Sequence, residues 1–147
     1  MNRQEVQILL IRRCGEFMLQ AKMDTATDGE NEHTADPALW ALRMLGYSPA
    51  SIVSISEAEV AAVAADHVSA FLDLAELRLL ENIRGNLTRV STSLTREMGV
   101  VESWGQLLTQ ITALVKDRTE KIENMHGSLL VFPLSGGGKR LAMLQAV

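Results

Sequence analysis

The chain has 147 residues, which fits one domain that buries about two thirds of the surface its unfolded form exposes. Hydrophobic residues make up 47% of it and aromatic residues only 4%, so the core must be built from aliphatic side chains and methionine. The formal net charge of −4 argues against a dedicated nucleic-acid-binding protein, because such proteins usually present a basic face.

Cys14 is the sole cysteine, which excludes an intrachain disulfide and a cysteine-rich metal site. The N-terminal apolar run is short and is broken by Arg12 and Arg13, unlike the continuous apolar core of a signal peptide. No stretch approaches the roughly 18 apolar residues of a membrane span. We therefore expect an intracellular protein, or one assembled inside a cell, that does not enter membranes.

The first third of the chain predicts two helices joined by a polar loop. Apolar residues recur at three- and four-residue steps over 2–22, although Arg13 interrupts this stripe. Residues 24–36 are almost free of apolar side chains and predict a solvated loop. Asp36 and Pro37 then predict a helix start, since aspartate caps free amides and proline is tolerated at the first helical position. Gly46 predicts its end.

The middle of the chain predicts a short helix followed by a long one. Ser56 and Glu59 have the spacing of a capping box, in which each side chain accepts the backbone N–H of the other residue. A break near Asp66 divides the alanine-rich segment that follows, and Asp66 is the expected cap of the second part. Residues 85–86 predict the end of that helix, and the Ser/Thr-rich segment 87–100 predicts a connecting loop.

The last third predicts a long helix and an arm. Apolar residues repeat at helical spacing over 101–126, with Arg118 among them, and Gly127 predicts the helix end. The segment 128–134 is apolar and β-prone, and three glycines follow it. The sequence therefore predicts an all-α bundle of four to five helices over 1–127 and an extended C-terminal arm, with a short β-strand, over 128–147.

The glycine run and Lys139 look like part of a phosphate-binding loop. A Walker A loop needs a glycine five positions before its Gly-Lys pair and a Ser or Thr directly after it. Pro133 and Arg140 occupy these two positions here, and only seven residues follow Arg140. We expect no nucleotide cofactor at this segment.

Other chemistry-bearing residues predict no catalytic or metal site. His33, His67 and His126 lie in different elements, none with a second ligand type at metal spacing. Asp73 and Glu76 are neighbours on one helix face, as paired catalytic acids are, but a solvated face with Arg78 and Arg84 in reach is the favoured interpretation. We expect no enzymatic activity, no metal and no cofactor.

An arginine string and the arm are the remaining candidate contact regions. Arg84, Arg89 and Arg96 can touch nucleic acid or a neighbouring subunit, although ordinary solubility is the favoured interpretation. The arm is apolar on both sides of its glycines, so it either folds back over the bundle or adds to another chain. The partner-binding residues inferred from the arm are Leu130, Val131, Phe132, Leu134, Lys139, Arg140, Leu141 and Leu144.

The layout also resembles a known family. An N-terminal helix, a polar loop, the segments DPALWALRMLGYSPASIVSISEAEVAAV and DLAELRLLENIRGNL, a long closing helix and an apolar arm are similar to the head-to-tail connector (adaptor, or head-completion) proteins of tailed bacteriophages. The resemblance implies a homo-oligomeric ring, commonly of about twelve copies, in the virion neck. It also implies assembly in the host cytoplasm, with DNA passing through the channel without sequence-specific binding.

The resemblance implies two protein partners, the portal protein and a tail or stopper protein, with the arm reaching the portal. The function expected from it is that of a ring-forming structural adaptor around the DNA channel. The alternative is a small helical regulatory or protein-binding module with no enzymatic activity.

Overall fold

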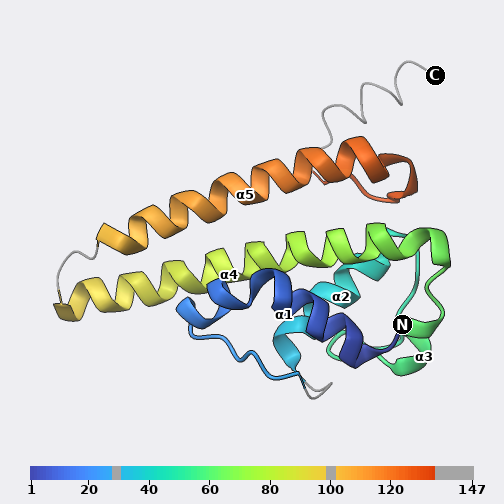
Figure 1. Ribbon diagram of the computed structural model, residues 1–147, viewed down its shortest axis with the longest axis horizontal. Helices are drawn as coiled ribbons and strands as arrows, with labels where there is room; N and C mark the ends of the chain where they lie inside the picture. The colour runs from blue at the N-terminus through green and yellow to red at the C-terminus, as the bar shows by residue number, and fades with distance from the viewer. Residues whose placement is uncertain (28–30, 99–101, 135–147) are drawn as a thin grey trace.

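The computed structural model describes residues 1–27, 31–98 and 102–134, and within these residues it holds helices and no strand (Figure 1). The predicted all-α class and helix number are confirmed. The helices are α1 (Arg3–Gln20), α2 (Glu32–Met44), α3 (Glu57–Ala61), α4 (Val68–Met98) and α5 (Glu102–His126), with two 3-10 turns, η1 (Ala65–His67) and η2 (Gly127–Leu129).

Helix α4 is the centre of the bundle. It contacts α1, α2 and α5, and Figure 1 shows α5 running along the side of α4 that α1 and α2 leave open. A helix surrounded by other helices is buried on several sides, and α4 is buried in this way over its first half, between Ala70 and Ile83. The residues of α4 that are at most 2% exposed are Ala70, Phe71, Leu74, Ala75, Leu77, Leu79, Leu80, Ile83 and Leu87.

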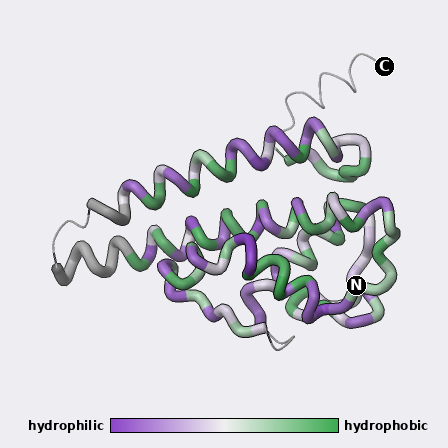
Figure 2. The backbone as a smooth tube through the Cα atoms, in the orientation of Figure 1, coloured by the Kyte–Doolittle hydropathy of each residue, from purple (hydrophilic) through white to green (hydrophobic). Residues whose placement is uncertain are grey.

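Helix α5 has one apolar face, as its sequence predicts. Ile111, Val115 and Ile122 are buried, while Lys116, Glu120 and other polar residues between them are exposed. Figure 2 shows hydrophobic and hydrophilic residues alternating along α5. Such a pattern suits a helix that covers one side of the core and shows its other face to water.

The predicted helix end at 85–86 and loop at 87–100 are wrong, because α4 continues to Met98. Gly85 lies inside the helix with open space where a Cβ would be, so its cost is only the weak helix propensity of glycine, about 1 kcal/mol. The next turn outweighs this cost, since Leu87 is fully buried and the Thr88 hydroxyl donates to the Arg84 carbonyl at 3.0 Å. The α4–α5 hairpin consequently extends past the ends of α1 and α2 (Figure 1).

The predicted start of the second helix at Asp36 is also wrong. Asn31 is the N-cap of α2: its side chain accepts the His33 N–H at 3.0 Å. The Asn31 amide also donates to the Asp24 carbonyl at 2.8 Å and thereby closes the polar loop. Asp36 instead accepts from the Asn82 amide of α4 at 2.8 Å. Pro37 lies inside α2, where the buried residues around it offset its missing N–H.

The predicted capping box at the start of α3 is confirmed. The Ser56 hydroxyl accepts the Glu59 N–H at 3.1 Å, and the Glu59 carboxylate accepts the Ser56 N–H at 3.0 Å. The bonds from Ser56 hold the pKa of the Glu59 carboxyl below its ordinary value. The predicted break before α4 is confirmed too. Asp66, the expected cap of α4, instead lies within η1.

Candidate interaction surface

The chain after α5 folds back onto the bundle instead of extending from it. The turn η2 reverses its direction, and the Val131 N–H then donates to the Met44 carbonyl at the end of α2, at 2.8 Å. Gly46 permits this approach, since its φ is +91° and a Cβ there would lie 3.1 Å from Cγ2 of Val131. The described part of the arm, 128–134, is therefore attached to the end of α2.

No strand forms over 128–134, so the predicted β-strand is not present in this described part of the arm. Residues 128–129 belong to η2, and the residues after them are irregular. A strand needs a neighbour for its N–H and C=O groups, and the described residues contain no sheet edge to provide one. The rest of the arm, 135–147, lies outside the described residues.

We call the segment 127–134 the fold-back. It buries some of the predicted partner-binding residues and leaves others exposed. Leu130 is only 7% exposed and belongs to the core, and Leu134 is partly buried against it. Val131 and Phe132 are 55% and 54% exposed. We call these two residues the exposed apolar pair. Lys139, Arg140, Leu141 and Leu144 lie outside the described residues.

Asp73 and Glu76 do not lie on a solvated face, contrary to the sequence interpretation. Glu76 is 8% exposed, and Arg13 of α1 reaches both carboxylates through one nitrogen, Nη1. This nitrogen lies 2.8 Å from Oε2 of Glu76 and 3.2 Å from Oδ1 of Asp73. The predicted partners Arg78 and Arg84 do not bind them; Arg78 instead pairs with Asp36 and Glu81.

Helix α5 completes this cluster. Arg118 Nε lies 3.2 Å from Oε1 of Glu76, and His126 Nε2 lies 3.0 Å from Oδ2 of Asp73. We call Arg13, Asp73, Glu76, Arg118 and His126 the charged cluster. It joins α1, α4 and α5 on one side of the bundle. With a side-chain nitrogen from α1 or α5 at every carboxylate oxygen, the acids act here as links between helices.

The sequence contains one indication of this cluster, the arginines in its apolar stripes, but it does not show which carboxylates pair with them. Arg13 and Arg118 both occupy positions in the apolar stripes of their helices. A guanidinium in such a position needs an opposite charge on the facing helix, because burying an unpaired charge is costly. Asp73 and Glu76 on α4 supply that charge.

The three histidines lie apart from one another, each with its own local role. Nδ1 of His67 lies 2.9 Å from the Tyr47 hydroxyl, which itself accepts the Ala64 N–H at 3.0 Å. His126 belongs to the charged cluster, and the His33 N–H binds the α2 cap. Over residues 1–27, 31–98 and 102–134, no group of three or more His, Cys, Asp or Glu residues is placed to hold a metal ion.

Of the three arginines predicted as a contact region, Arg84 and Arg89 have described side chains. Arg89 donates to the Asn86 side chain one turn earlier on α4, and Arg84 is half-buried. Arg96 lies in α4, but its side chain is outside the described part. None of the helices described is long and apolar enough to cross a lipid bilayer.

Cys14 is buried in the core next to the charged cluster. Burial, and after it the negative charge of Glu76, raise the pKa of its thiol to about 12. A thiolate is the nucleophilic form of cysteine, so this position suits a packing role and not a reactive one.

The pH dependence of the free energy of unfolding tests whether the Cys14 thiol is buried in this way. As pH rises past the ordinary thiol pKa of 9.0, the unfolded chain loses the Cys14 proton while the folded chain retains it up to about pH 12. This contribution to stability is fully present below pH 9.0 and is lost above it. We expect the advantage of the wild type over Cys14→Ala in urea unfolding to shrink by about 1.5 kcal/mol between pH 9 and about pH 10.5. Equal pH profiles would contradict the raised pKa.

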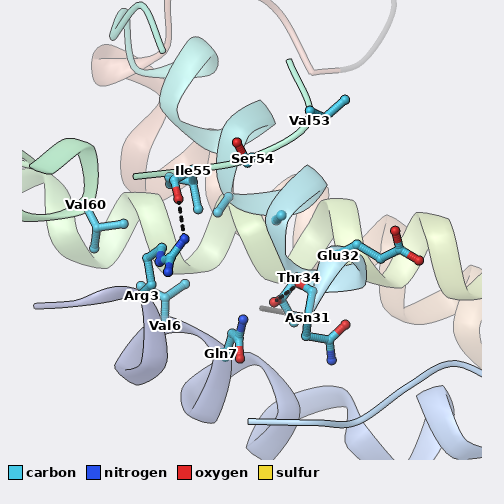
Figure 3. Close-up of a pocket in the computed structure, with 12 residues that line it drawn as sticks. Arg3, Val6, Gln7, Asn31, Glu32, Thr34, Val53, Ser54, Ile55 and Val60 are labelled. Carbon is cyan, nitrogen blue, oxygen red and sulfur yellow. Dashed lines mark hydrogen bonds between the residues drawn. The ribbon is translucent and has the colours of Figure 1, made fainter. Parts of the chain in front are cut away.

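A small pocket lies between α1, the start of α2 and the segment before α3 (Figure 3). Its volume is about 90 Å³, far below the roughly 300 Å³ at which ordinary ligand pockets begin. Arg3 spans its edge by donating from Nη1 to the Ile55 carbonyl at 3.2 Å, and the Thr34 hydroxyl donates to the Asn31 carbonyl at 2.9 Å. This pocket has room for a few water molecules.

Comparison of the chain with protein-family models, with curated proteins and with solved structures gave no significant match. The function is therefore argued from the residues of this chain.

Proposed function

We propose that this protein is a non-enzymatic structural subunit, a ring-forming adaptor that joins a phage portal to its tail or stopper protein around the DNA channel. The ring assembles in the host cytoplasm and resides in the virion neck. DNA passes through it without sequence-specific binding. The proposal combines the resemblance in sequence layout with two structural observations, of which the exposed apolar pair is the main one and the projecting α4–α5 pair the second.

The exposed apolar pair supports a protein partner because it is both apolar and held in place. The Val131 N–H is bonded to α2, and Leu130 directly before it is buried, so the backbone that leads into Phe132 is anchored to the bundle. Binding energy in protein interfaces concentrates in a few large side chains, often aromatic, that fit partner pockets. An anchored phenylalanine loses less entropy on binding than one on a free tail.

The two-helix hairpin supports a subunit of an assembly. Helices α4 and α5 extend together past α1 and α2, which makes the molecule elongated (Figure 1). An elongated subunit presents separate regions to neighbours, here the segment 128–134 near one end and the projecting part of α4 and α5 towards the other. This arrangement suits a protein that bridges two others.

A double substitution tests the proposal. Val131→Asp with Phe132→Asp places charges on the exposed apolar pair, and we expect binding to purified portal particles in co-sedimentation to weaken at least about tenfold. Both side chains are half-exposed, so the bundle should still fold. Leu19→Asp is the matched control, since Leu19 is 62% exposed on α1, far along the chain from the fold-back. It should leave binding unchanged.

Point substitutions are preferable to deleting the arm. Removing residues 128–147 also removes Leu130 from the core, so folding and binding would change together. The mass of the wild-type protein with and without portal gives the second measurement. A monomer or dimer that ignores the portal would contradict the adaptor and favour the alternative, a small helical regulatory or protein-binding module.

A further inference from the structure

A shallow depression lies over the charged cluster, at the surface where α1, α4 and α5 meet. Its lining is almost entirely charged: Arg13, Asp73, Glu76, Arg118, Lys121 and Ile122. Ile122 is only 1% exposed, so it forms the floor beneath the charged side chains. The depression is a separate feature from the exposed apolar pair.

The carboxylate oxygens that line this depression all have hydrogen-bond or ion-pair partners within the protein. Each of the four carboxylate oxygens of Asp73 and Glu76 lies within 3.2 Å of a side-chain nitrogen of Arg13, Arg118 or His126. Both carboxylates are thereby held in fixed positions by groups from α1 and α5.

Some of the N–H donors that line the depression have no partner among the described residues. Arg13 makes both of its bonds through Nη1, which leaves Nε and Nη2 without a protein acceptor in the described part of the chain. Arg118 uses Nε for Glu76 and Nη1 for Asp117. Lys121 is exposed on α5 and has no ion pair among the described residues. The lining residues therefore include three side-chain cations and two carboxylates, a surplus of one positive charge within the lining; Asp117, beside Arg118, lies outside it.

We propose that this depression binds one carboxylate group, carried by an acidic side chain of a partner polypeptide. A single carboxylate matches the surplus charge, and the unused guanidinium N–H groups have the planar fork that carboxylates accept. A phosphate dianion exceeds the surplus and meets the negative charges of Asp73 and Glu76. The depression is open to solvent, so a side chain on another protein can reach it. This inference does not depend on the portal as partner.

Charge reversal at Lys121 tests the site. The probe is an acetylated peptide of four glutamates, titrated into the folded protein and followed by backbone amide chemical shifts. We expect the shifts in the wild type to concentrate around Arg13, Glu76 and Lys121. In Lys121→Glu the new carboxylate lies one turn from Arg118 and occupies the site itself, so peptide binding should weaken at least about fivefold.

Lys116→Glu is the matched control, since Lys116 is also exposed on α5 but lies outside the depression. The two variants change net charge equally, and we expect Lys116→Glu to alter peptide affinity less than about twofold. Equal weakening in both would overturn the site in favour of diffuse charge attraction. Inorganic phosphate that binds at Lys121 more tightly than the peptide, at equal ionic strength, would overturn the assignment to a carboxylate.

Discussion

Phe71→Ala is expected to lower the free energy of unfolding by about 3–5 kcal/mol. Phe71 is fully buried on α4, the helix that α1, α2 and α5 surround. Removing its ring takes away apolar burial and leaves a cavity that rigid neighbouring helices cannot fill completely. Urea unfolding followed by circular dichroism measures the change, and the loss is a large part of the stability of an ordinary domain.

The chain contains only three phenylalanines, which gives a graded set of controls. Phe17→Ala should cost an intermediate amount, since Phe17 is partly buried against the core. Phe132→Ala should cost less than about 1 kcal/mol, because half of its side chain is already in water. If Phe71→Ala and Phe132→Ala cost the same, α4 is not the centre of the core.

The sequence predicted correctly those helices whose ends depend on residues within or next to the helix itself. The capping box at Ser56 and Glu59 and the apolar stripe of 101–126 each contain the information for their own helix. The start of α2 was missed because its cap, Asn31, sits in a polar loop and is held by the carbonyls of Asp24 and Ala26. The length of α4 was missed because packing at Leu87 outweighs the helix-ending signal at Gly85.

The candidate surface was predicted only in part, for a related reason. An unbroken apolar run such as 129–132 does not state which side chains face the core. The bond from Val131 to Met44 and the turn at η2 decide this, placing Leu130 inside and Phe132 outside. Similarly, the spacing of Asp73 and Glu76 was visible in the sequence, but their partners come from α1 and α5, about 40 to 60 residues away. Pairing across such separations is fixed by tertiary packing.

Glu76→Gln is expected to lower the free energy of unfolding by about 2–3 kcal/mol. Breaking a fully buried ion pair costs about 3–5 kcal/mol, and the partial exposure of Arg13 and Arg118 reduces this, because water can solvate the guanidiniums left behind. Glutamine keeps the size of the side chain, so the loss reports charge and not packing. Glu81→Gln on the same helix is the control: its carboxylate lies 3.8 Å from a half-exposed Arg78, and its loss should cost less than about 1 kcal/mol.

A second readout distinguishes the charged cluster from a general loss of helix stability. The Glu76 carboxylate helps to raise the pKa of the Cys14 thiol, so Glu76→Gln should lower that pKa, while Glu81→Gln should leave it unchanged. An alkaline titration of thiolate absorbance in the folded protein measures both. If Glu76→Gln destabilises the chain but the Cys14 pKa does not move, the carboxylate does not lie where the cluster places it. If Glu76→Gln lowers both the free energy of unfolding and the Cys14 pKa, the Glu76 carboxylate lies beside Cys14 and holds α1, α4 and α5 together. The same carboxylate lines the depression that we propose receives a partner's carboxylate.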